Sequence, residues 1–136
     1  MRFARWVFRI AGIFGLIVLL PLYLMEEQLG RDNPPAITHP EYFYGFVGVA
    51  LVWQLVFLLI GQDPVRYRLL MILAILEKAV WSLPVFALFA QARVSGTTLA
   101  AGIIDFVWGL LFVLAYRQSE STEPTAPGAA PDRAGK

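Results

Sequence analysis

Four long apolar stretches occupy most of this chain of 136 residues. They run approximately over residues 6–25, 43–60, 69–90 and 98–116. A helix needs about 20 consecutive apolar residues to cross the hydrocarbon core of a bilayer, and each stretch has about that length. Only 15% of the residues are charged, and a soluble domain of this size could not bury four such segments. The sequence therefore predicts an all-α fold, a polytopic membrane protein built as a bundle of four transmembrane helices.

The domain organisation follows from a change of composition after the last stretch. Residues 1–117 are expected to form the transmembrane domain, and residues 118–136 to form a tail. The tail mixes Ser, Thr, Glu, Pro, Ala and Gly, and it cannot bury enough apolar area to offset the entropy of ordering it, so it is predicted to be disordered. The first apolar stretch exceeds the 7–15 residues of a signal peptide, and it ends without a small-residue cleavage site. We expect it to remain as an uncleaved helix.

The basic residues predict the orientation in the membrane. One side of the predicted bundle carries most of them: Arg2, Arg5, Arg9, Arg66, Arg68 and Arg117. The other side has Arg31 and Arg93, with several acids close by. Because cytoplasmic loops carry an excess of Lys and Arg, both termini are expected to face the cytoplasm. The predicted location is the cell (inner) membrane, with multiple passes.

Strongly polar residues lie deep inside three of the apolar stretches. Gln54 is in the second, Glu77 and Lys78 are in the third, and Asp105 is in the fourth. At 1.5 Å per residue, all of them fall in the central third of a core about 30 Å thick. A central Glu, Asp or Lys costs roughly 2.5–3.5 kcal/mol on insertion, so these side chains should face the interior of the bundle.

Tryptophans accompany the acids. Trp81 follows Glu77 by four residues and Trp108 follows Asp105 by three, so each shares a helix face with a carboxylate. An acid beside an indole face suits a cationic ligand through cation–π contact, and it also suits a flat, lipid-like molecule. The candidate intramembrane ligand-binding residues are Gln54, Glu77, Lys78, Trp81, Asp105 and Trp108.

Structural alternatives stay open for the same residues. Lys78 with Asp105 could be a purely structural ion pair, and the tryptophans could fill gaps in the bundle and donate their N–H groups to the acids. Glu77 could pair with Lys78, take a proton, or accept a hydrogen bond from Gln54.

Two local signals predict helix starts. Thr38 and Glu41 have the spacing of a capping box, which predicts the start of the second helix there. Asp63 followed by Pro64 predicts an N-cap and a first helical position for the third helix.

Several kinds of chemistry find no support in the sequence. The chain has no cysteine, and its single histidine, His39, lies in a loop without further metal ligands, so we predict no metal site and no cofactor. No nucleophile motif or phosphate-binding loop is present, so no catalytic residue is assigned. The net charge of +1 lacks the clustered basic surface that nucleic acid binding requires.

The chain resembles small four-helix proteins of bacterial inner membranes that are loosely grouped as DoxX-like. The resemblance rests on the architecture and on residues 44–54 (YGFVGVALVWQ), 63–68 (DPVRYR) and 77–78 (EK). It implies a fold and no activity. The order of Glu77, Trp81, Asp105 and Trp108 is also similar to EXPERA-type sterol-binding and isomerase proteins, although a histidine at membrane depth is missing. Small multidrug resistance transporters are similar in size, but their membrane-embedded Glu lies in the first helix, which has no acid here.

Three functional hypotheses follow. The first is a binding module for a lipophilic or cationic small molecule in an intramembrane pocket. The second is a structural or interaction subunit, as a homo-oligomer or beside a membrane partner. The third is an EXPERA-like lipid-modifying enzyme. The sequence favours the first, and it names no ligand.

Overall fold

The computed structural model describes residues 2–120, and side chains through residue 119. This part of the chain is helical and contains no strand. Its elements are α1 (Arg2–Leu19), a 3₁₀ helix η1 (Leu20–Leu24), α2 (Glu26–Asp32), α3 (Pro40–Gln62), α4 (Arg68–Ala90) and α5 (Gly96–Glu120). The predicted all-α fold is confirmed.

Four of these segments are long and apolar enough to cross a membrane, namely Arg2–Leu24, Pro40–Gln62, Arg68–Ala90 and Gly96–Ser119. Each has a mean hydropathy of 1.9 or more, and each contains the centre of one predicted stretch. The chain therefore has the make-up of a multi-pass membrane protein. The predicted four-helix transmembrane bundle is confirmed.

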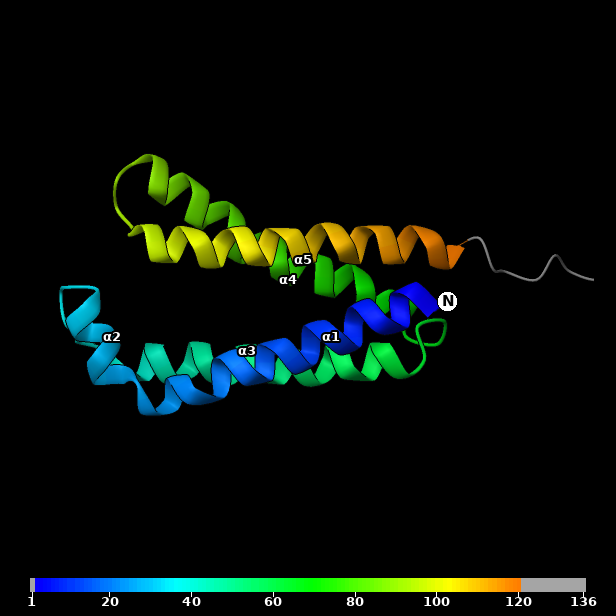
Figure 1. Ribbon diagram of the computed structural model, residues 1–136, viewed down its shortest axis with the longest axis horizontal. Helices are drawn as coiled ribbons and strands as arrows, with labels where there is room; N and C mark the ends of the chain where they lie inside the picture. The colour runs from blue at the N-terminus through cyan, green and yellow to red at the C-terminus, as the bar shows by residue number, and fades with distance from the viewer. Residues whose placement is uncertain (1, 121–136) are drawn as a thin grey trace, which may run out of the picture.

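The spans form two antiparallel pairs, α1 with α3 and α4 with α5 (Figure 1). One end of the bundle holds the start of α1, the α3–α4 connection and the last turns of α5, and we call it the terminus end. The opposite end holds α2 and the α4–α5 connection, and we call it the α2 end. Figure 1 shows the two pairs close together at the terminus end and apart at the α2 end.

The hydrophobic core occupies the half of the bundle nearer the terminus end. Its centre is a set of fully buried rings, Phe8, Phe57 and Phe112, one each from α1, α3 and α5. Phe8 stacks on Phe112 with centroids 4.3 Å apart, and Phe57 meets Phe112 edge-on at 5.0 Å. Small residues bring the backbones close around these rings: Ala4, Ala11, Ala74 and Ala115.

The connection between the first two spans differs from the prediction. No helix was predicted between residues 25 and 43, whereas the structure contains one there, α2, which begins just after η1. Tyr44 on α3 donates a hydrogen bond from Oη to Glu26 Oε2 over 2.7 Å, and this holds the first turn of α2 against α3. Glu26 and Glu27 lie in the first turn of α2 and Arg31 in its last, an arrangement that favours the helix dipole.

Both predicted helix starts are wrong in detail. α3 begins at Pro40 with His39 as its N-cap and without a side-chain capping bond, because Glu41 contacts the His39 ring at 3.2 Å instead of closing a capping box. Asp63 Oδ1 does accept the backbone N–H of Arg66 at 3.2 Å, but it caps only an isolated turn. α4 itself begins at Arg68.

The last span is longer than predicted at both ends. Ser95 caps it, because its Oγ accepts the backbone N–H of Thr98 at 3.3 Å, and the helix therefore begins at Gly96. It continues to Glu120, so residues 118–120, which were assigned to the tail, are helical. The remainder of the predicted disordered tail, residues 121–136, lies outside the described residues.

Candidate functional site

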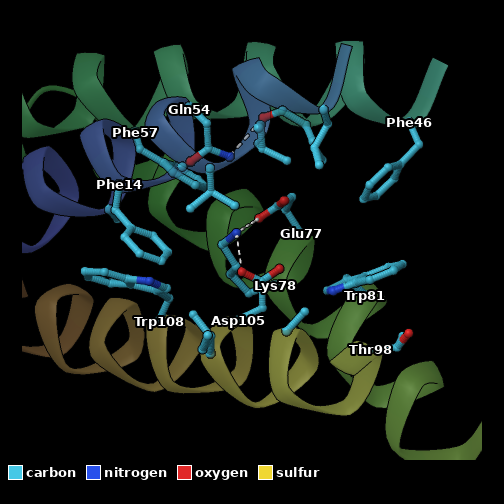
Figure 2. A pocket seen from close by; sticks show the side chains of 18 of the residues that line it. Phe14, Phe46, Gln54, Phe57, Glu77, Lys78, Trp81, Thr98, Asp105 and Trp108 are labelled. Carbon is cyan, nitrogen blue, oxygen red and sulfur yellow. Dashed lines mark hydrogen bonds and ion pairs between the residues drawn. The ribbon is translucent and has the colours of Figure 1, made fainter. Parts of the chain in front are cut away.

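Three charged side chains meet at the middle of the bundle. The Lys78 ammonium on α4 donates a hydrogen bond to Asp105 Oδ1 on α5 at 3.0 Å. It also lies 3.3 Å from Glu77 Oε2. Figure 2 shows the ammonium between the two carboxylates, and we call Glu77, Lys78 and Asp105 the charged cluster. The sequence predicted that ionisable residues from separate spans meet at this depth, and the geometry places them together.

The charged cluster lies far from both ends of its helices. Lys78 is about 15 Å from the first residue of α4, and Asp105 about 14 Å from that of α5, at 1.5 Å per residue. The side chains of Lys78, Glu77 and Asp105 are 7%, 16% and 25% exposed. With two carboxylates and one ammonium, the formal charge of the cluster is −1. Either a proton or a cation can balance a buried excess charge of this kind.

One carboxylate oxygen of the charged cluster is incompletely satisfied. Glu77 Oε2 is buried and makes no hydrogen bond. Among the described residues, its polar contact is the ion pair with the Lys78 ammonium. Carboxylate oxygens normally accept more than one hydrogen bond, and a buried one without any is costly. Glu77 is therefore incompletely satisfied by hydrogen bonds, although its Oε2 atom is covered by protein atoms.

Gln54 lies at a similar depth but belongs to the other helix pair. Its side-chain amide donates to the Ala50 carbonyl of its own helix at 2.9 Å. Its side chain packs against Gly15 of α1, where an added Cβ would overlap the amide. The alternative in which Gln54 bonds Glu77 is not what the structure shows.

A cavity of about 550 Å³ opens between the two helix pairs in the half of the bundle nearer the α2 end. The charged cluster forms its floor together with Gln54 and Phe57. Along α5 its lining runs from Thr97 to Trp108, which is about 16 Å at the helical rise. All six candidate residues, Gln54, Glu77, Lys78, Trp81, Asp105 and Trp108, line this cavity. The space is large enough for a drug-sized molecule, since such sites measure roughly 300–1,000 Å³.

The two predicted tryptophans lie on opposite sides of the charged cluster (Figure 2). Trp81 on α4 contacts Phe46 on α3, with ring centroids 5.1 Å apart. Trp108 on α5 contacts Phe14 on α1 at 6.0 Å. Each contact joins one helix pair to the other. Within the described residues, neither indole N–H donates to Glu77 or Asp105, so the tryptophans present ring surface to the cavity and leave the acids to Lys78.

Lys78 also contacts the opposite helix pair through a ring. Its ammonium lies 5.2 Å from the centroid of Phe57 on α3. The alternative of a purely structural Lys78–Asp105 pair keeps support from this packing. The ion pair itself joins α4 to α5, which are already neighbours, and so it does little to fasten the two helix pairs together.

Several elements that were not predicted to belong to the site also line the cavity. α1 supplies Phe14 and Val18, and α2 with its C-cap supplies Leu29 and Asn33. These residues belong to no motif. In the sequence, an apolar residue that faces the cavity cannot be distinguished from one that faces lipid. The spacing of Phe14 to Val18, one helical turn apart, is the only available signal, and it is common to any amphipathic face.

The chain has no match among protein families, curated proteins or solved structures. The resemblances to DoxX-like and EXPERA-type proteins therefore stay predictions. The proposed function of the site therefore rests on its own geometry.

Proposed function

We propose that this protein binds a lipophilic molecule carrying a positive charge in the cavity between its two helix pairs. The observation that carries the proposal is the charged cluster at the floor of that cavity. Glu77 and Asp105 share a single ammonium, from Lys78, so one negative charge is left over. A ligand cation would balance this charge in a region where water cannot.

The rest of the cavity wall suits the apolar part of such a ligand. It is lined mainly by aliphatic and aromatic side chains from every span. The rings of Trp81, Trp108 and Phe14 lie beside the carboxylates, and a cation over an aromatic face gains about 0.5–2 kcal/mol. Glu77 and Asp105 both line the cavity, so a positive group there would lie near two carboxylates.

The charge at the α2 end supports a cationic ligand as well. The acids there outnumber the basic residues: Glu26, Glu27, Asp32 and Glu41 stand against Arg31 and Arg93. Clefts rimmed by one sign of charge raise the local concentration of oppositely charged ligands.

Binding of tetraphenylphosphonium to purified protein tests the proposal. Titration calorimetry should show saturable binding, and the neutral analogue triphenylphosphine oxide should bind at least about tenfold more weakly, because removing one charge contact costs more than 1.4 kcal/mol. Glu77→Gln and Asp105→Asn should each weaken binding of the cation by a similar factor. Asp63→Asn is the matched control, since this exposed carboxylate lies in the α3–α4 connection at the terminus end, away from the cavity. Equal affinity of both probes for the original protein and both variants would exclude a cation site.

A structural or interaction role is the second candidate, and the short Lys78–Asp105 bond is the observation that favours it. In a Glu77→Gln background, replacing Lys78 and Asp105 together by Leu should then be tolerated far better than replacing either one, since a single change leaves a buried charge. Native mass spectrometry of gently extracted protein would show a homo-oligomer, a partner subunit or a retained lipid. A stable double variant that assembles normally and a protein without bound small molecules would favour this second role.

We also propose that the terminus end faces the cytoplasm, in an inner membrane. The basic residues at that end support this orientation: Arg2, Arg5, Arg9, Arg66, Arg68 and Arg117. A green fluorescent protein fused after the last residue should fluoresce, and alkaline phosphatase at the same position should be inactive. The opposite pair of results would reverse the topology.

A further inference from the structure

We propose that the cavity exchanges its ligand at the α2 end only, through an entrance that α2 covers as a lid and that the Asn33–Ser95 hydrogen bond holds shut. The identity of the ligand rests on the proposed function. The existence of the lid rests on the contacts of α2 alone.

The terminus end offers no route to the charged cluster. Phe57 closes the floor of the cavity, and Phe8 and Phe112 are fully buried beyond it. The sides are narrowed as well, because the Phe46–Trp81 and Phe14–Trp108 contacts each bridge the two helix pairs beside the charged cluster. The cavity continues toward the α2 end, where polar residues line it: Asn33, Thr97 and Thr98.

α2 is attached to the bundle at both of its ends, by unequal bonds. At its start, the Tyr44–Glu26 hydrogen bond of 2.7 Å fixes it to α3, a member of the same helix pair as α1. At its end, Ser95 Oγ donates to Asn33 Oδ1 at 3.1 Å and ties the α2 segment to the other pair. The first bond involves a carboxylate and is the stronger; the second is neutral and exposed, so it breaks more readily.

The Asn33–Ser95 bond stands at the mouth of the cavity. Asn33 itself lines the cavity, as do Leu29 on α2 and Thr98 on α5. Ser95 is also the N-cap of α5, so its position is fixed relative to Thr98. When the bond breaks, α2 can move with the α1–α3 pair, to which Tyr44 holds it, and the entrance widens without disturbing the charged cluster.

A bridge between positions 33 and 95 tests the lid. The chain contains no cysteine, so the double variant Asn33→Cys/Ser95→Cys carries the only thiols. A bifunctional thiol reagent with a one-carbon spacer would join them, and mass spectrometry would confirm the bridge. Tetraphenylphosphonium should then associate and dissociate about tenfold or more slowly by stopped-flow fluorescence, since lid opening is required for exchange. The single variants Asn33→Cys and Ser95→Cys, treated with the same reagent, lose the hydrogen bond and cannot be bridged, so they should exchange the probe at least as fast as the original protein.

A second readout needs no ligand. In a protein whose other tryptophans are replaced by Phe (positions 6, 53 and 108), the fluorescence of Trp81 reports on the cavity. Bridging positions 33 and 95 should lower its quenching by acrylamide at least about threefold, because the quencher must pass the lid. Unchanged quenching and unchanged exchange rates after bridging would overturn the lid and indicate passage between helices from the lipid. Failure of the probe to bind the unbridged protein, with quenching still lowered by the bridge, would overturn the proposed function and leave the lid.

Discussion

The two halves of this bundle are built from the same four spans, yet one is filled and the other is hollow. Near the terminus end, Phe8, Phe57 and Phe112 fill the space between the helix pairs and are fully buried. Near the α2 end, the same helices enclose a cavity of about 550 Å³. The charged cluster lies at the boundary. The rings of the filled half pack the helix pairs together, whereas the other half leaves a cavity beside the charged cluster.

The contrast within α3 makes the same point on a single helix. Gly61, near the terminus end, lies so close to α1 that an added Cβ would be 2.7 Å from Arg9 Cγ and 3.1 Å from the Arg9 backbone nitrogen. Arg9 also donates from Nε to the Gly61 carbonyl at 3.0 Å. Gly45, near the α2 end, has nothing within 4 Å of such a Cβ. Close backbone contact thus holds α3 against α1 near the terminus end, whereas Gly45 is exposed and does not line the cavity.

The largest effect is expected from emptying the filled half. Phe112→Ala removes a buried ring that contacts Phe8 and Phe57, and it should lower the free energy of unfolding by about 4 kcal/mol. Phe46→Ala in the hollow half is the matched control, because that ring is already 46% exposed, and it should cost less than about 1 kcal/mol. Denaturant titrations in detergent, followed by tryptophan fluorescence, measure both. Equal losses would mean that the two halves are packed alike.

The next largest effect concerns the boundary. Lys78→Met leaves Glu77 and Asp105 without their shared cation and should destabilise the protein by about 3 kcal/mol. Adding Glu77→Gln and Asp105→Asn to the same chain should restore most of that loss, since no buried charge then remains. The same unfolding titration reports the result. A triple variant as unstable as the single one would show that the Lys78 side chain stabilises by packing and not by charge.

A smaller effect separates the two glycines of α3. Gly61→Ala should cost about 2 kcal/mol, because the Arg9 backbone must move to admit a methyl group. Gly45→Ala should cost nothing and even stabilise the helix slightly, by up to about 1 kcal/mol. Thermal unfolding of the two variants measures both changes in stability. A loss at Gly45 equal to that at Gly61 would place a close neighbour beside Gly45 and contradict its exposed position.

The smallest effect on stability belongs to the mouth of the cavity. Asn33→Ala removes one exposed, neutral hydrogen bond and should lower the free energy of unfolding by about 0.5 kcal/mol. Ser95→Ala should cost about 1 kcal/mol, because it also removes the N-cap of α5. Hydrogen exchange at the amides of α2 should rise in both variants. Protection of α2 that does not change in either would show that the bond to Ser95 does not hold the lid.

The sequence was sufficient for the spans and for the depth of the charged cluster. Apolar length alone located four helices, and the cost of a charge in lipid predicted that Glu77, Lys78 and Asp105 would turn inward. The helix α2 was missed because its segment, EEQLGRD, is short and polar. A helix this short is stabilised by tertiary contacts, such as the hydrogen bond between Tyr44 and Glu26.

The cavity could not be predicted from the sequence for a related reason. Exposed apolar residues such as Val49 and cavity-lining ones such as Phe14 are chemically alike, and hydrophobicity does not distinguish lipid from an apolar pocket. Which helices pair, and how far the pairs separate, depends on close contacts such as Gly61 with Arg9. The sequence of one helix does not show which other helix packs against it.

Cysteine accessibility of α3 in nanodiscs tests the hollow half most directly. Ala50 lines the cavity, its neighbour Val49 is 62% exposed on the outer surface, and Ala74 on α4 is buried in the filled half. Each of these residues is replaced by cysteine in a separate variant, which then contains a single cysteine. Each variant is treated with a small, charged, membrane-impermeant thiol reagent. The account predicts that Ala50→Cys is modified, while Val49→Cys, which faces lipid, and Ala74→Cys, which is packed, are not. An unmodified Ala50→Cys under conditions that label a cysteine at the α2 end would contradict the cavity, and with it the site.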